Sequence, residues 1–281
     1  MTFSEVISQL RPTLKTYAYH ICGSLADAED VVQDVLLKFL ALDQENIEHV
    51  RAYLIRMVIN HAINQKKKLK KQALDYPGEW LPEPVATEKA DAGINRKEIL
   101  SYSLMVLLEK LNPRQRAVFI LKEAFDYEHA EIANVLDIKP DLSRQLLARA
   151  KKSIGNPKLL QPDRVPQSFL GRYLSVLQSG DMQCLENLLN EDIVSVSDGG
   201  GKARAAIKPV HGRKSVAALL MGLYTKFYED SIIVEGFVNQ EPALFYYQGD
   251  KLVTCITFVL TAGQIIRTFI IRNPDKLKNL N

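Results

Sequence analysis

Apolar positions recur every three or four residues through most of the first 155 positions, and this spacing predicts a succession of amphipathic α-helices. Helices are expected over 3–21, from Ser24, from about Val50 to Lys71, and again from near Ile94 to 154. Ser24 followed by Asp27 is a helix-start signal. The buried stripe expected on the second helix consists of Ala28, Val31, Val35, Phe39 and Leu42.

The pattern changes after a Pro-containing tether at about 156–166. Helical spacing continues over about 165–178, 181–190 and 214–228, and then segments rich in Val, Ile, Thr, Phe and Tyr follow. These segments predict strands near 231–238, 243–248, 251–261 and 264–271, with turns at 248–250 and 261–263. Helices followed by an antiparallel sheet indicate an α+β domain.

Residues 72–95 lack periodicity and carry several prolines together with the only tryptophan of the chain, Trp80. We interpret this segment as a linker. Because an exposed tryptophan in a tether would reduce solubility, we expect Trp80 and Leu81 to dock onto a protein surface.

The composition is that of a globular protein of two or three compact units, with 47% hydrophobic and 25% charged residues among 281. The net charge of +3 is small, so attraction to nucleic acid must come from local patches such as KKKLKK at 66–71. Cys22, Cys184 and Cys255 form no CxxC motif, so we expect no metal site and no cofactor. No signal peptide or membrane span is visible, and we expect a cytoplasmic protein with no membrane contact.

Residues 128–154 have the outline of a helix-turn-helix. Asp137 stands where the turn usually carries glycine, and Pro140 suits the first turn of the second helix. The predicted inner faces are Ala130, Ile132, Ala133 and Leu136 on the first helix, and Leu146, Leu147, Ala150 and Ile154 on the second. The outward set is Arg144, Gln145, Arg149 and Lys152. These side chains can read base edges or hold phosphates in a major groove, although pairs of short helices with surface cations also occur in proteins that never bind DNA.

Two other helical faces carry functional chemistry. Asp27, Asp30 and Asp34 share the polar side of the second helix. Amides and cations share one side of the third helix, where they could contact bases and phosphates together: Arg56, Asn60, Asn64 and Lys67. For both faces the alternative is an ordinary solvated surface.

With these residues in view, the chain resembles a bacterial RNA polymerase sigma factor of the extracytoplasmic-function group. DAEDVVQDVLLKFL at 27–40 and YLIRMVINHAINQ at 53–65 resemble two helices of sigma region 2, and LNPRQRAVFILKEAF with the helix-turn-helix resembles region 4. The resemblance implies two all-α sigma domains followed by an α+β domain of NTF2-like, SnoaL-like fold with a curved, mainly antiparallel sheet. The expected boundaries are 1–71 for region 2, 72–95 for the linker, 96–155 for region 4, 156–164 for a second linker and 165–281 for the C-terminal domain.

The resemblance also implies partners and roles. Core RNA polymerase would be bound through its β′ clamp and β flap, with Asp27, Asp30, Gln33 and Asp34 on the polymerase side. Arg56, Asn60, Asn64 and Lys67 would capture the −10 promoter element, and Arg144, Gln145, Arg149 and Lys152 would read the −35 element. Polymerase would perform the chemistry, so the chain needs no catalytic residue.

Three short signatures narrow the resemblance to the subgroup with a C-terminal SnoaL-like domain that regulates activity in cis. The first, in the linker, is Trp80, Leu81, Pro82, Glu83 and Pro84. The second is Asp198, Gly199, Gly200, Gly201 and Lys202. The third is Asn273, Pro274, Asp275, Lys276 and Leu277. Ser143 departs from region 4 in general, where an apolar core residue is usual.

Other interpretations stay open at this point. A SnoaL-type ligand-binding or enzymatic domain, with His211 or Asp198 as a general base, could be fused to a helix-turn-helix regulator that acts without polymerase. A purely structural helical adaptor would leave the amide-rich third helix unexplained. The sequence does not identify the promoter, the activating signal or any ligand of the C-terminal pocket. A monomer is favoured because promoter recognition needs no two-fold symmetry.

Overall fold

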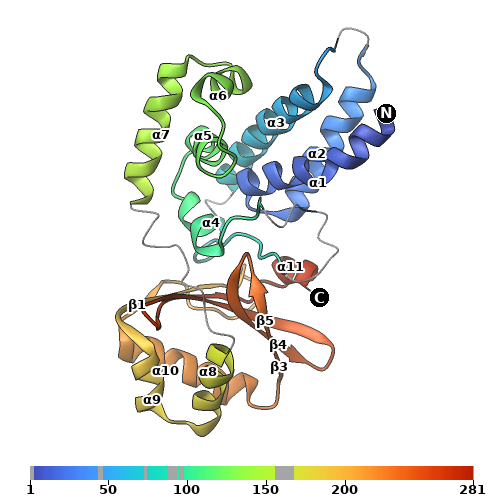
Figure 1. Cartoon of the computed structure of the whole chain (residues 1–281). Helices are drawn as coiled ribbons and strands as arrows, with labels where there is room; N and C mark the ends of the chain where they lie inside the picture. Colours follow the sequence, from blue (N-terminus) through green and yellow to red (C-terminus); the bar gives the residue numbers. More distant parts are fainter. Residues whose placement is uncertain are drawn as a thin grey trace. The chain divides into compact units, whose positions relative to one another are not determined.

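The computed structural model describes residues 3–43, 47–72, 75–87, 94, 98–155 and 168–280. The chain divides into two compact units: Met1–Leu74, Ala90–Leu100 and Leu104–Leu159 form the first, and Asp75–Lys89, Ser101–Ser103 and Leu160–Asn281 form the second. Figure 1 shows both, coloured along the chain. The linker expected at 156–164 lies outside the described residues. Within the described part, no helix combines the length and hydropathy needed to cross a bilayer.

The first three helices of the first unit are α1 (Phe3–Cys22), α2 (Leu25–Leu40) and α3 (Val50–Gln72). Ser24 caps α2, because its side chain accepts a hydrogen bond from the Asp27 backbone N–H at 3.2 Å. The predicted stripe is confirmed by the burial of Ala28, Val31, Val35 and Phe39. It is wrong for Leu42, which is 43% exposed because α2 ends at Leu40 and the helical spacing ends with it.

Four further helices are α4 (Tyr102–Leu108), α5 (Pro113–Glu123), α6 (His129–Leu136) and α7 (Pro140–Ile154). A helix starting near Ile94 is wrong: Ile94 and the residues from 98 to 101 are described, and none is α-helical. The Leu100 N–H donates to the His20 ring at 3.2 Å instead of to a helical carbonyl. Asp137 ends α6 in the left-handed region with φ 52°, as its position in the turn predicts.

The second unit begins with helices α8 (Ser168–Ser179) and α9 (Met182–Leu188), then strands β1 (Leu189–Asp198) and β2 (Val210–His211). Helix α10 (Arg213–Leu223) continues into a π-helix, η4 (Tyr224–Tyr228). Strands β3 (Ile232–Val238), β4 (Glu241–Gln248), β5 (Lys251–Thr261) and β6 (Gln264–Ile271) follow, and the chain ends with α11 (Pro274–Leu277) and the 3-10 helix η5 (Lys278–Leu280).

The six strands form one sheet in the order β2-β1-β6-β5-β4-β3. Among the strands of the described residues, the β1–β6 pair alone is parallel, so the expected α+β domain with a mainly antiparallel sheet is confirmed. The helix expected over 181–190 is shorter than predicted, because strand β1 begins at Leu189 and takes over the last two positions.

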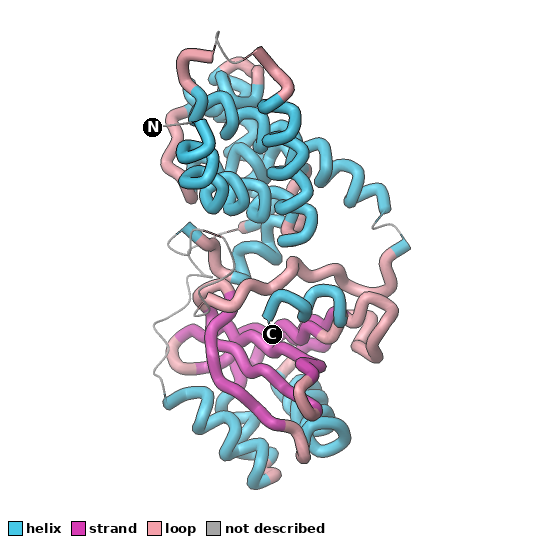
Figure 2. Tube along the Cα trace, turned by 90° about the vertical axis from the view of Figure 1, so that its right-hand side faces the viewer, coloured by secondary structure: helices cyan, strands magenta, loops and turns pink. Residues whose placement is uncertain are grey.

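Helices α8, α9 and α10 gather on one face of this sheet (Figure 1), and the twisted strands are magenta in Figure 2. Alternate strand residues such as Leu244, Ile256 and Ile270 join the helices in an apolar core. Their neighbours Ala243, Cys255 and Phe269 point to the other face and are also buried. The Tyr102 ring packs there, with its centroid 5.5 Å from that of Phe269. A sheet buried on both faces explains why β4 and β5 read as nearly continuous apolar runs.

Candidate nucleic-acid interfaces and linker-docking site

Helix α7 presents a cationic outer face. The predicted inner face of Leu146, Leu147, Ala150 and Ile154 is buried as expected. The outward residues Arg144, Gln145, Arg149 and Lys152 are all exposed. Arg144 pairs with Asp141 at 2.6 Å in solvent, so it is partly neutralised, whereas Arg149 and Lys152 have no salt bridge among the described residues. The exposed face of α7 can therefore donate several hydrogen bonds to one groove.

The inner face of α6 differs from prediction at one position. Ile132, Ala133 and Leu136 are buried, but Ala130 is exposed because α6 starts only at His129, and its first turn precedes the contact with α7. Ser143, the departure from the usual apolar residue, is fully buried, and its hydroxyl lies 2.9 Å from His129 Nδ1. This hydrogen bond satisfies a polar group that would otherwise destabilise the helix-turn-helix core.

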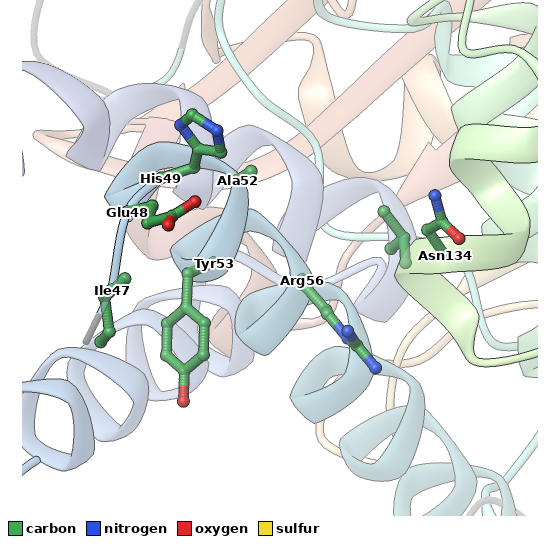
Figure 3. Close-up of a pocket in the computed structure, with 8 residues that line it drawn as sticks. Ile47, Glu48, His49, Ala52, Tyr53, Arg56 and Asn134 are labelled. Atoms are coloured by element: carbon green, nitrogen blue, oxygen red, sulfur yellow. The ribbon is translucent and has the colours of Figure 1, made fainter.

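The amide face of α3 is partly engaged. Arg56, Asn64 and Lys67 are exposed. Asn60 donates from its side chain to the Arg56 carbonyl at 2.9 Å and to the Val135 carbonyl at 2.8 Å, so it links α3 to α6. A hollow of about 430 Å³ adjoins this contact (Figure 3). It is lined by Ile47, Glu48, His49, Ala52, Tyr53, Arg56, Asn134 and Val135.

The acidic face of α2 joins polar side chains of α3. Asp30, Gln33 and Asp34 are exposed. His61 lies 3.2 Å from Asp34, and the Gln65 side-chain amide donates to Asp27 at 2.8 Å. The face is thus solvated but organised, with two of its three carboxylates anchored to the neighbouring helix.

The basic run at 66–71 is only partly a surface patch. Lys66 is buried, and its ammonium donates to the Cys22 carbonyl at 2.7 Å and pairs with Glu109 at 2.8 Å. Burial and then the nearby Arg116 charge lower the pKa of Lys66 to about 8. Lys70 donates to the carbonyls of Glu109 and Leu111. Only Lys67, Lys68 and Lys71 remain exposed for a nucleic acid.

Glu109 balances two buried cations, and sequence reasoning missed it. Besides Lys66, the carboxylate pairs with the fully buried Arg116. Burial by itself would raise the pKa of Glu109, but the charges of Arg116 and Lys66 lower it below its ordinary value. Arg116 also donates to the His20 carbonyl at 2.7 Å. This network ties α1, α3 and α5 together within the first unit.

In the second unit, the carboxylate of Asp198 is where the three short signatures meet. Its side chain is fully buried and accepts hydrogen bonds from the Tyr76 hydroxyl at 2.5 Å and the Leu81 backbone N–H at 2.9 Å. The Lys276 ammonium lies 2.5 Å away and also donates to the Leu81 carbonyl. One carboxylate therefore joins the end of β1, the linker and helix α11.

The remaining residues of the first signature are also held. The Lys276 ammonium lies 4.1 Å from the Trp80 ring centroid, which is a cation–π contact. Leu81 and Pro84 are buried, the Pro82 carbonyl accepts from the Tyr102 hydroxyl at 2.7 Å, and Glu83 accepts from Asn279 at 2.6 Å. The expected docking of Trp80 and Leu81 thus takes place on the C-terminal domain.

The glycines of the second signature allow close approach. A Cβ on Gly199 would overlap the Ala203 backbone, and one on Gly200, which has φ +60°, would overlap the Asn273 side chain. Asn273 in turn donates to the Tyr76 hydroxyl at 3.0 Å. Lys202 forms an exposed ion pair with Asp275. The second and third signatures are therefore in direct contact. Pro274 is the first residue of α11, and Leu277 is buried at its end.

The turn between β3 and β4 makes a second anchor that the sequence analysis did not identify. Asn239 exchanges two hydrogen bonds of 2.9 Å with Val85, through its backbone N–H and its side-chain oxygen. Gln240 donates to the Thr87 hydroxyl at 2.9 Å. Next to them, the fully buried Glu241 accepts from the Ser103 backbone N–H at 3.1 Å and from its hydroxyl.

Asn239 and Gln240 both have positive φ, a conformation that asparagine adopts more readily than most residues. Nothing in the sequence indicates that the glutamate beside this turn is buried, and it forms no salt bridge among the described residues. Burial raises the pKa of Glu241 to about 8, although the Ser103 hydrogen bonds partly oppose the rise.

The two candidates for a general base lie in different surroundings. Asp198 is hydrogen-bonded to Tyr76, Leu81 and Lys276, and His211 is exposed on the two-residue strand β2.

Residues 6–72 match the family Sigma-70 region 2, and residues 101–154 match Sigma-70, region 4. The chain is 33% identical over 285 residues to the ECF RNA polymerase sigma factor SigJ of Mycobacterium tuberculosis strain H37Rv, covering 95% of this chain and 90% of that protein. It is 22% identical to the probable ECF RNA polymerase sigma factor SigI of the same species, covering 96% of this chain and 93% of that protein. The crystal structure of Mycobacterium tuberculosis SigJ superposes with a TM-score of 0.79 at 27% identity, covering 99% of each chain.

Proposed function

Because this chain belongs to the extracytoplasmic-function sigma factors of RNA polymerase, we propose that its C-terminal domain regulates in cis how the two sigma regions engage polymerase and promoter. The protein is an RNA polymerase-binding, promoter-recognising sigma factor with regions 2 and 4. Its similarity to SigJ extends through the C-terminal domain as well. We place its action in the cytoplasm, with polymerase supplying the catalysis.

We assign the polymerase contact of region 2 to Asp27, Asp30, Gln33 and Asp34, against the β′ clamp, and a contact of region 4 to the β flap. The support for the first is that Asp30, Gln33 and Asp34 are exposed on one face of α2. Anchoring of Asp27 and Asp34 by α3 would orient this face before polymerase is met, so less side-chain entropy is lost on binding.

We assign the −10 element to Arg56, Asn60, Asn64 and Lys67 and the −35 element to Arg144, Gln145, Arg149 and Lys152. The exposed cations and amides of α7 suit direct reading of a major groove. Asn60 is different, because its amide is hydrogen-bonded to the Val135 carbonyl of α6. We therefore propose that Asn60 exchanges this carbonyl for a base when the promoter is bound.

The single observation that carries the regulatory proposal is the buried Asp198 carboxylate, which holds both Leu81 of the linker and Lys276 of α11. The linker joins region 2 to region 4, so a domain that grips it also restricts how far apart the two regions can move. Because a tethered domain acts at a high effective concentration, a modest contact area is sufficient to keep it bound to the linker. Asn239 and Gln240 add a second contact with the same linker, through Val85 and Thr87.

In vitro transcription with core polymerase tests this proposal. We expect Asp198→Asn and Trp80→Ala in the full chain, and a chain ending at Gly155, to change the amount of transcript from a cognate promoter. Asp250→Asn, in the exposed β4–β5 turn, is the matched control and should leave the output unchanged. Transcript levels that are the same for wild type, D198N and W80A would contradict regulation through this contact.

The alternative is a helix-turn-helix regulator that acts without polymerase and carries a ligand-binding or enzymatic domain. It is not favoured, because the family matches include sigma region 2 as well as region 4. The transcription assay also distinguishes these two functions. A sigma factor supports initiation only when core polymerase is present, whereas a polymerase-independent regulator would bind the promoter tightly by itself.

A further inference from the structure

A groove of about 420 Å³ lies on the C-terminal domain beside α10 and η4. Its walls come from the loop after β1, from one side of α10, from η4 and from the residue that follows β6. The lining residues are Arg204, Ala205, Ala206, Ala218, Leu219, Gly222, Leu223, Lys226, Phe227 and Arg272. The volume falls in the range of about 300–1,000 Å³ that is typical of small-molecule sites.

The charge of this groove is positive and is not balanced locally. Arg204, Lys226 and Arg272 line it, no acidic residue does, and none of the three forms a salt bridge within the described part of the chain. Arg272 is held in place, because its guanidinium donates to the Arg204 carbonyl and lies 5.6 Å from the Phe227 ring centroid. Three cations converging on one hollow attract an anion with more than one charge.

The floor of the groove is apolar and is kept open by a glycine. Gly222 lies inside α10, where glycine destabilises a helix by roughly 0.5–1 kcal/mol relative to alanine. A Cβ at this position would meet no atom within 4 Å, so packing does not require glycine here. Leu219 and Leu223 line the groove together with Gly222, and we call this apolar part of the lining the floor.

The mouth of the groove is shaped by the π-helix η4. The wider turn places Lys226 and Phe227 on the groove, and Phe227 is 41% exposed although it is a large aromatic residue. π-Helical turns are uncommon and frequently occur at functional sites. An exposed ring beside cations is the arrangement on which nucleic-acid bases stack.

We propose that this groove binds a nucleotide, with its phosphates on Arg204, Lys226 and Arg272 and its base over Phe227 and the floor. Phosphate is favoured over a single carboxylate because three cations line the groove and a nucleotide phosphate carries more negative charge than one carboxylate. The nucleotide could be free or part of a single strand. This site does not depend on the regulatory proposal, although Arg272 also donates its backbone N–H to the Asp198 carbonyl at 2.8 Å and so adjoins the linker contact.

Fluorescence anisotropy of the full chain with N-methylanthraniloyl-ADP tests the site. Arg272→Gln removes a charged donor and should weaken binding by about 10- to 100-fold. Gly222→Leu fills the groove without a clash at the Cβ, and it should weaken binding to a similar degree. Gly222→Ala, which leaves most of the space, and Lys208→Gln, a neighbouring exposed cation outside the groove, should bind like wild type.

Competition distinguishes the sources of the nucleotide. Displacement of the probe by unlabelled ADP, but not by a twelve-residue oligothymidylate, supports a free nucleotide, and displacement by the oligonucleotide supports a single strand. The proposal is overturned if the probe does not bind at millimolar concentration, if R272Q and G222L bind as wild type does, or if laurate displaces the probe and ADP does not. Circular dichroism shows whether the G222L variant is folded. If G222L is unfolded, the binding measured for R272Q alone tests the proposal.

Discussion

Replacement of Asp198 by asparagine isolates the energy of the linker-docking site. The substitution preserves shape but leaves the Lys276 ammonium, whose side chain is 10% exposed, without its counter-charge. Breaking a buried ion pair from one side costs about 3–5 kcal/mol. For a domain of this size, each kcal/mol lowers the melting temperature by about 2–4 °C, so D198N should melt on the order of 10 °C below wild type.

The sole tryptophan makes the assay local, since Trp80 lies against Lys276 in the docked linker. Its fluorescence during thermal unfolding should report the loss of docking. Lys202→Met is the matched control: it removes an ion pair with Asp275 whose side chains are 58% and 45% exposed, and surface pairs contribute only ~0–1 kcal/mol. The double substitution D198N with Lys276→Met removes both charges and should recover part of the loss. A D198N transition that coincides with that of K202M would show that the Asp198–Lys276 pair does not stabilise the docked linker.

Three other outcomes follow from the same structure. Arg149→Ala should reduce transcription from a promoter with an intact −35 element by the equivalent of about 1–3 kcal/mol. The control, Lys151→Ala, removes an exposed ion pair with Glu123 at 2.7 Å and should have little effect on transcription. Equal losses for the two variants would argue against base reading by α7. Burial raises the pKa of Glu241 from 4.5 to about 8, so the folded state holds its proton more tightly than the unfolded state, and the contribution of Glu241 to stability should fall by up to about 1.4 kcal/mol per pH unit between pH 4.5 and 8. Urea titrations of wild type and Glu241→Gln at several pH values should give a difference in unfolding free energy that changes with this slope, and a difference that is constant with pH would contradict it. Ser143→Ala should destabilise the first unit by about 1–3 kcal/mol by leaving His129 without its partner, and a melting temperature that is unchanged or higher would show that this hydrogen bond is dispensable.

Interior sequence patterns predicted the helices well because burial of one face leaves a regular trace. Ala28, Val31 and Phe39 follow the helical repeat, and all are buried. The wrong predictions of burial lie at the ends of helices, at Leu42 and Ala130, because an apolar repeat in the sequence does not show where the neighbouring helix stops covering it. The expected helix near Ile94 failed for a related reason: Leu100 has a tertiary partner in His20.

Local spacing and residue type were sufficient to predict the order of the helical and α+β parts, the outward set on α7 and the three short signatures. Which distant groups meet became visible in the folded chain alone. Lys66 looked like part of a surface patch and is buried against Glu109, and Asp198 looked like part of a glycine turn and is bound to Leu81 and Lys276. Glu241 gave no signal at all. Pairing of charges that lie 43 residues apart in the chain, as for Lys66 and Glu109, or 78 residues apart, as for Asp198 and Lys276, depends on where the backbone brings them in space, and burial then decides how strongly they interact.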